Sequence, residues 1–198
     1  MPLLRFVLIG ALCGTLLSVC TVGHTGNNKI LVKRKLIRLS RILEMDNPHQ
    51  RNIRLLGELH ETFDYNAFEQ KVLQDSAGQF TPSQRTRFSS AFQRMFEHKL
   101  IALSNDDSLH CEDYKVSEGL RESDVVITCK TRNAADHITL HFKSARSKKV
   151  VDFSMGNALL SRNYRGVINK SLRTHGAEEL IKKIVSKSTC TLNGKSLF

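Results

Sequence analysis

The chain has 198 residues and a formal net charge of +11, because 30 lysines and arginines stand against 19 aspartates and glutamates. This length suits one ordinary domain plus a processing segment, and a hydrophobic content of 40% excludes an intrinsically disordered chain. The positive charge favours a phosphate-bearing partner: a nucleic acid, a lipid headgroup or an anionic membrane surface.

Residues 1–23 have the pattern of a secretory signal. A short basic start ending at Arg5 precedes an apolar run from Phe6 to Val19, and polar residues follow from Gly23. The run is shorter than the ~20 apolar residues of a membrane-spanning helix, so we expect export with cleavage, with an uncleaved membrane anchor as the alternative. Because exported proteins rarely meet nucleic acid, the charge then indicates a lipid or a membrane and no nucleic-acid partner.

Helical spacing of apolar residues dominates the chain up to Asn105. It predicts helices over 28–44, after Pro48, and from Asp64, whose carboxylate would cap the third helix. The clearest helix begins at Thr81 to Gln84, which combines a cap residue, a proline at the first helical position and a capping-box glutamine. The apolar stripe of this helix carries three phenylalanines: Phe88, Phe92 and Phe96.

After Asn105 the apolar residues alternate with polar ones, and this period predicts four strands. The strands are marked by Tyr114 and Val116; by Val125, Ile127 and Cys129; by Ile138, Leu140 and Phe142; and by Val151, Phe153 and Met155. One apolar and one polar face are typical of an antiparallel sheet with one side in water.

Three cysteines remain after cleavage of the signal: Cys111, Cys129 and Cys190. An oxidising compartment permits one disulfide. If the first hairpin centres on Leu120, Cys111 lies opposite Cys129, because each is nine residues from that centre. We therefore predict a Cys111–Cys129 disulfide, with two buried thiols as the alternative.

Helical spacing returns near the C-terminus and predicts helices over 159–174 and 177–187 around Gly176, then a frayed tail over 189–198. The order of helices, strands and helices predicts a single α+β domain over residues 28–188. In this fold, helices pack on one face of a curled antiparallel sheet of about four or five strands. Such an arrangement can enclose an apolar cavity between sheet and helices.

The sequence carries no Gly-x-Ser-x-Gly elbow and no His-Glu-x-x-His helix. The stretch 194–196 resembles the end of a phosphate loop, but Thr189 stands where that loop needs its first glycine. His137 and His141 share a strand face about 13 Å apart, too far to hold one metal ion. We expect no enzyme, no cofactor and no metal site. A hydrolase remains an alternative and would need acid and base residues lining the cavity.

Several stretches of sequence resemble one known family. Phe63 to Leu73 contributes Phe-Asp, then Phe68 and an apolar pair, and the next helix begins with Thr-x-x-Gln-Arg-x-x-Phe-x-x-x-Phe over 81–92. Residues 149–155 and then Asn163-Tyr164-Arg165 follow in order, as do Gly176 and an apolar pair at 180–181. This series resembles the MlaC family of periplasmic phospholipid-binding proteins, the soluble part of an ABC-type lipid transport system.

The chain departs from the family at two places. The family usually has Trp at the position of Lys148, and an acidic residue followed by Gly where this chain has Gly156-Asn157. These departures suggest a divergent member with altered cargo or partner choice.

The resemblance implies a pocket that takes the acyl chains of a phospholipid and leaves the headgroup toward water. It implies a periplasmic carrier that shuttles lipid between an inner-membrane ABC transporter complex and an outer-membrane lipoprotein complex, with transient membrane proximity. The alternative is an exported adaptor that binds a protein partner through an apolar groove. The candidate lining residues, for each of which plain core packing is the alternative, are Phe88, Phe92, Phe96, Ile127, Ile138, Leu140, Phe153, Leu160 and Tyr164.

Two basic features have open interpretations. Arg165, with Tyr164, either holds a headgroup or anchors its helix to the sheet. The cations of the first helix either steer the carrier to anionic membranes or acidic partners, or form a solvated face. These cations are Lys29, Lys33, Arg34, Lys35, Arg38 and Arg41.

Overall fold

The computed structural model describes residues 27–104, 113–121, 123–130, 135–144, 146–155 and 157–190, so the predicted signal over 1–23 lies outside it. The N-terminal part contains α1 (Asn27–Leu43), α2 (Pro48–Thr62), α3 (Tyr65–Leu73), a 3-10 turn η2 (Ala77–Gln79) and α4 (Pro82–Ser104). Five strands and a last helix follow: β1 (Asp113–Glu118), β2 (Asp124–Lys130), β3 (Ala135–Phe142), β4 (Val150–Met155), β5 (Ala158–Leu159) and α5 (Leu160–Cys190).

Side-chain caps fix the starts of α3 and α4 as predicted. The Asp64 carboxylate accepts a hydrogen bond from the Ala67 N–H at 3.0 Å. Thr81 and Gln84 form a reciprocal capping box: the Thr81 N–H donates to Gln84 Oε1 at 3.0 Å, and the Gln84 N–H donates to Thr81 Oγ1 at 3.3 Å. These bonds satisfy backbone groups that a helix start leaves unpaired.

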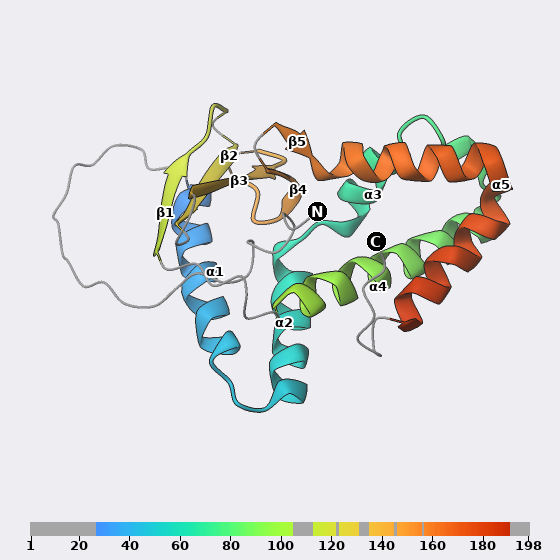
Figure 1. Ribbon diagram of the computed structural model, residues 1–198. Helices are drawn as coiled ribbons and strands as arrows, with labels where there is room; N and C mark the ends of the chain where they lie inside the picture. Colours follow the sequence, from blue (N-terminus) through green and yellow to red (C-terminus); the bar gives the residue numbers. More distant parts are fainter. Residues whose placement is uncertain are drawn as a thin grey trace, which may run out of the picture.

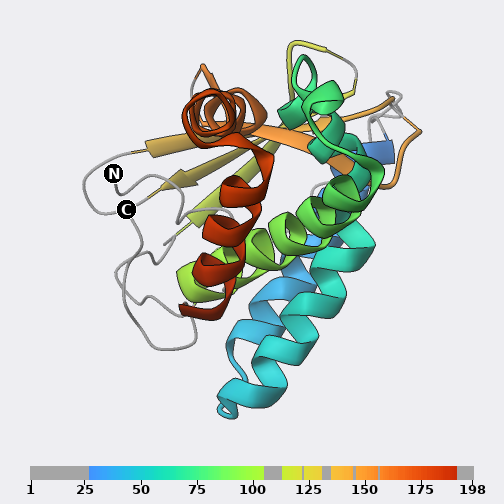
Figure 2. The same cartoon turned by 90° about the vertical axis from the view of Figure 1, so that its right-hand side faces the viewer.

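The strands form one antiparallel sheet in the order β1-β2-β3-β4-β5, so each strand pairs with its neighbour in sequence. Ile127 pairs with Ile138, and Leu140 pairs with Phe153. The helices gather against this curled sheet, with the α1–α2 hairpin reaching away from it (Figures 1 and 2). The predicted α+β class is thereby confirmed.

The register of the first hairpin corrects the sequence prediction. Cys129 lies opposite Tyr114, because the hairpin centres between residues 121 and 122 and not on Leu120. Gly119 packs against Asp124 so closely that a Cβ there would lie 2.6 Å from the Asp124 Cβ. Cys129 is disulfide-bonded. Cys111 lies outside the described residues, so the Cys111–Cys129 pair stays a prediction.

The α5 helix bends at Gly176, whose φ of 75° is a left-handed conformation that glycine tolerates. Its first half runs beside α3, and its second half folds back along α4 (Figures 1 and 2). The two predicted helices are therefore present. The second continues to Cys190, two residues into the predicted tail of 189–198, and the rest of that tail lies outside the described residues.

Contacts at both ends of the α1–α2 hairpin join it to the sheet. The Asn28 side-chain amide donates to the carbonyl oxygen of Ser144 at 3.1 Å, just after β3. Phe63 forms a parallel bridge with Val150, and the Asp64 N–H donates to the Val150 carbonyl at 2.8 Å. Of the helices in the described ranges, none is long and apolar enough to cross a bilayer.

Candidate functional site

An apolar cavity lies between the α1–α2 hairpin, α4 and one face of the sheet. Its free volume is about 80 Å³. A water molecule needs at least about 10–15 Å³ by this measure, so the cavity holds only a few water-sized groups. The apolar wall consists of Leu31, Val32, Leu36, Leu39, Leu59, Phe63, Phe96, Leu100, Ile127, Leu140, Phe142, Val150 and Phe153.

Four polar residues complete the lining, and three of them carry charge: Lys35, Glu58 and Lys148, with Thr62 as the fourth. Lys148 is exposed, so the cavity reaches the surface beside it, whereas Glu58 is buried and Lys35 is largely buried. Apart from these three charged residues and Thr62, the wall is apolar.

Ion pairs that include two of the lining residues, Lys35 and Glu58, join α1 to α2. Lys35 Nζ lies 3.0 Å from Glu58 Oε2 and 2.8 Å from Glu61 Oε2, and Arg38 lies 2.8 Å from Glu58 Oε1. The hydrogen bond from Lys35 lowers the pKa of Glu61, and that to Glu58 raises the pKa of Arg38. The two helices should therefore move as a unit relative to the sheet.

Of the nine candidate lining residues predicted from the sequence, four line the cavity: Phe96, Ile127, Leu140 and Phe153. The other five are not among its lining residues: Phe88, Phe92, Ile138, Leu160 and Tyr164. Which of the nine contact a lipid stays a prediction.

Phe88, Phe92 and Tyr164 belong to an aromatic cluster beneath α3 and α5. The Phe92 ring lies 5.4 Å from that of Phe88 and 5.4 Å from that of Tyr164, and 6.0 Å from that of Phe68. Burial raises the pKa of Tyr164. We call Phe68, Phe88, Phe92 and Tyr164 the aromatic cluster; it is filled by rings, unlike the cavity.

The sequence reasoning missed the contribution of the first two helices. Leu31, Leu36 and Leu39 of α1, with Leu59 of α2, form part of the cavity wall. The signal was present as the apolar stripe of each helix. Nothing in that stripe says whether it faces a filled core or a cavity.

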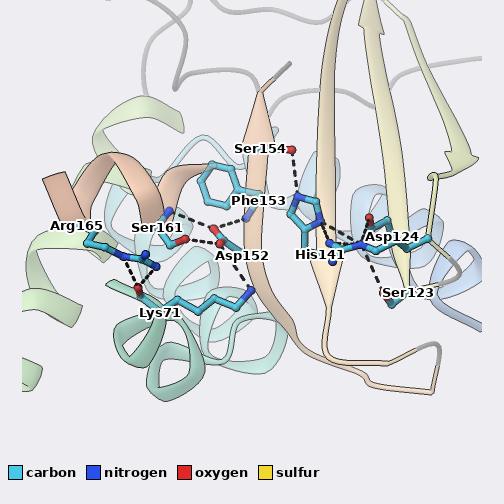
Figure 3. Close-up of polar contacts among 10 residues, drawn as sticks. Lys71, Ser123, Asp124, His141, Asp152, Phe153, Ser154, Ser161 and Arg165 are labelled. Atoms are coloured by element: carbon cyan, nitrogen blue, oxygen red, sulfur yellow. Dashed lines mark hydrogen bonds and ion pairs between the residues drawn. The ribbon is translucent and has the colours of Figure 1, made fainter. Parts of the chain in front are cut away.

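A chain of polar groups crosses β2, β3 and β4 (Figure 3). His141 Nδ1 lies 3.0 Å from Asp124 Oδ1, and His141 Nε2 lies 3.1 Å from Ser154 Oγ. Arg121 also donates to Asp124, at 2.9 Å. Burial opposes ionisation of Asp124, but the hydrogen bonds from Arg121 and His141 outweigh it and lower the pKa of Asp124.

This Asp–His–Ser chain lies on the sheet face opposite the cavity. His141 is flanked in sequence by Leu140 and Phe142, which line the cavity, and successive side chains of a strand point to opposite faces. The three groups are themselves buried. They join neighbouring strands, and a ligand in the cavity would not contact them.

A second network fastens the end of the sheet to α3 and α5 (Figure 3). The fully buried Asp152 accepts a hydrogen bond from Ser161 Oγ at 2.5 Å, and Lys71 Nζ lies 3.7 Å from its carboxylate. Arg165 donates twice to the Lys71 carbonyl oxygen, at 3.0 and 2.6 Å. Of the two interpretations of Arg165, these bonds support anchoring, although to α3 and not directly to the sheet.

Metal-binding chemistry finds no support in the described ranges, where no group of three His, Cys, Asp or Glu side chains is suitably placed.

Comparisons with known proteins agree with this architecture. One solved structure is a phospholipid-binding protein from Ralstonia solanacearum in complex with a phospholipid; it superposes with a TM-score of 0.67 at 15% sequence identity, covering 83% of this chain and 98% of that one. At this identity the likeness shows the fold alone. None of the curated proteins compared with the chain matches it. The model of the MlaC protein family matches residues 35–186, and the chain therefore belongs to the MlaC family.

Proposed function

We propose that this protein is a periplasmic carrier that holds the acyl chains of a phospholipid in the cavity between the α1–α2 hairpin and the sheet. The observation that carries the proposal is the almost entirely apolar wall, in which 13 of the 17 lining residues are hydrophobic. Membership of the MlaC family and the phospholipid in the related Ralstonia structure support it.

Burial of hydrocarbon alone can drive this binding. Each CH₂ group removed from water contributes about 0.8 kcal/mol. Because the wall is apolar and the exposed charged residue of the lining is Lys148, a lipid would enter chain-first and keep its headgroup in water near Lys148. The free volume of about 80 Å³ is too small for full acyl chains, so loading requires the walls to move apart.

The wider biology follows from the same proposal. Residues 1–23 act as a secretory signal, and residues 28–188 form the lipid-binding domain that moves lipid between an inner-membrane ABC transporter complex and an outer-membrane lipoprotein complex. We propose a carrier without enzymatic activity, because the Asp124–His141–Ser154 chain lies away from the cavity and Glu58 is held by two cations.

Native mass spectrometry tests the proposal on the chain from Thr25, purified without detergent, with lipid extraction of the same sample. We expect added mass that the extract identifies as phospholipid. A clean apo mass, with no uptake from phospholipid vesicles, would contradict the carrier and favour an adaptor that binds a protein partner.

A further inference from the structure

Two lysines line the cavity, and their ammonium groups differ in their partners. Lys35 is neutralised by Glu58 at 3.0 Å and Glu61 at 2.8 Å. Lys148 also lines the cavity but is exposed, and no residue in the described part of the chain forms an ion pair or side-chain hydrogen bond with it. Lys148 is therefore the cation at the opening that remains available to a ligand.

The segment that carries Lys148 strengthens this positive charge. Residues 143–149 read Lys-Ser-Ala-Arg-Ser-Lys-Lys, with four cations and no carboxylate. The segment connects β3 to β4, and residues on both sides of it, Phe142 and Val150, line the cavity. Between α1 and α2, the charges of Lys35 and Arg38 are balanced by those of Glu58 and Glu61. The opening as a whole is thus positive on its β3–β4 side.

We propose that Lys148 binds the phosphate of the lipid whose chains occupy the cavity, and that the site consequently prefers a headgroup of net negative charge to a zwitterionic one. The inference rests on the proposed function. A phosphodiester with an uncharged headgroup keeps its negative charge beside four cations. The ammonium of a zwitterionic headgroup is repelled by the same cations.

Short-chain lipids used as monomers test the headgroup without a membrane surface. Isothermal titration with dioctanoyl phosphatidylglycerol and dioctanoyl phosphatidylcholine compares identical chains below their micelle concentrations. For Lys148→Glu we expect phosphatidylglycerol binding to weaken by about fivefold or more, in line with the contribution of one Lys near an anionic lipid surface. Phosphatidylcholine loses the same phosphate contact, but its ammonium is freed from a repelling cation, so its binding should weaken by less, about twofold at most.

Two matched variants locate the effect. Lys149→Glu makes the same charge change in the same segment at a residue that does not line the cavity, and Lys170→Glu makes it on an exposed face of α5. We expect a smaller loss for Lys149→Glu and none for Lys170→Glu. Equal losses for Lys148→Glu and Lys149→Glu would overturn direct phosphate binding by Lys148, and equal losses for both lipids would overturn the headgroup preference. Thermal unfolding of each variant checks that the fold is retained.

The remaining outcomes separate the inference from the function on which it rests. If the unaltered chain binds both lipids equally and Lys148→Glu changes neither, the headgroup inference fails and the carrier stands. If the unaltered chain binds neither lipid, both fail. Inorganic phosphate, compared with chloride at equal ionic strength, should not displace bound lipid. Displacement by phosphate would show a site for free anions and contradict a lipid-specific contact.

Discussion

The α4 helix borders two regions that are built from similar side chains but filled differently. Toward its N-terminal end, Phe88 and Phe92 pack in the aromatic cluster, with ring centroids 5.4 Å apart. One and two turns later, Phe96 and Leu100 face the cavity beneath the α1–α2 hairpin. All four residues are buried. Burial alone therefore does not distinguish a packed core from the wall of a ligand cavity.

The difference arises from what covers each part of α4. Rings from α3 and α5 cover the N-terminal part, since Phe68 and Tyr164 both lie within about 6 Å of Phe92. Phe96 lies at the boundary, because its ring is 5.2 Å from that of Phe68 and it also lines the cavity. One turn further, Leu100 lines the cavity together with residues of the α1–α2 hairpin. The aromatic cluster should therefore supply stability, and the cavity should supply binding.

The largest expected effect is on the stability of the aromatic cluster. Phe92→Ala should lower the free energy of unfolding by about 3–5 kcal/mol, because the rings around it cannot fill the space that it leaves. Urea denaturation measures this loss. Lipid uptake per folded molecule should be unchanged. Loss of lipid uptake without loss of stability would place Phe92 in the binding site and contradict the distinction between the aromatic cluster and the cavity.

Filling the cavity should reduce lipid uptake with little effect on stability. Ile127→Trp places a large ring in the cavity, and we expect phospholipid uptake to fall more than tenfold while the fold is retained. Leu140→Phe adds less volume to the cavity and replaces Ile127→Trp if the tryptophan variant does not fold because of overpacking. The matched control is Val126→Trp, on the same strand but pointing to the other face of the sheet. Equal uptake by the two tryptophan variants would contradict the assignment of the cavity.

The ion pairs between α1 and α2 give a smaller effect on stability. Glu58→Gln removes a buried carboxylate bonded to Lys35 and Arg38, and should cost about 1–2 kcal/mol. Glu61→Gln, at a side chain that is 62% exposed, should cost much less, because solvent screens its ion pairs. Urea denaturation measures the loss of unfolding free energy for both variants. Equal losses would show that burial of Glu58 does not strengthen its ion pairs.

The smallest effect is a pH dependence at the edge of the aromatic cluster. Lys99 lies over the Tyr164 ring, 5.5 Å from its centroid. Burial, with a lesser contribution from Lys187, lowers the pKa of Lys99 to about 8 from 10.5. The folded state thus loses this proton first, and the unfolded state binds more protons between these pH values. Stability should rise with pH across that window. The two pKa values alone would give about 3 kcal/mol, and solvent screening of this partly exposed ammonium reduces the expected rise to about 1 kcal/mol.

Lys99→Met isolates this contribution from those of other groups that titrate in the same range. The difference in unfolding free energy between the unaltered chain and the variant should change between pH 8 and 10.5. A constant difference would mean that the ammonium is as well solvated in the folded state as in the unfolded state.

Periodicity and cap residues were enough to predict the helices and the four longer strands, but not β5, whose two residues are too few to show a period. The capping box at Thr81 and Gln84, the cap at Asp64 and the break at Gly176 are local signals, and each stands where it was expected. The hairpin register was wrong because it depends on where the turn is centred, and moving that centre from Leu120 to between residues 121 and 122 shifts every pair along the strands. Local sequence does not specify that centre.

The site was predicted only in part for a related reason. Phe88, Phe92 and Phe96 repeat at four-residue steps on one helix, so the sequence treats them alike, yet only Phe96 lines the cavity. Lys35 and Lys148 are distant in sequence and line the same cavity only through the fold. The order of elements predicted a cavity between helices and sheet, but the residues that line it depend on how the hairpin is placed.

Photo-cross-linking tests whether the acyl chain of a bound phospholipid lies in the cavity. A phospholipid with a diazirine in the middle of one acyl chain would be loaded, activated, and located by peptide mass spectrometry. We expect cross-links to cavity residues such as Leu36, Leu59 and Phe142, and fewer cross-links in the Ile127→Trp variant. Cross-links concentrated on Phe68, Phe88 or Tyr164 would contradict this expectation, because they would place the acyl chain in the aromatic cluster.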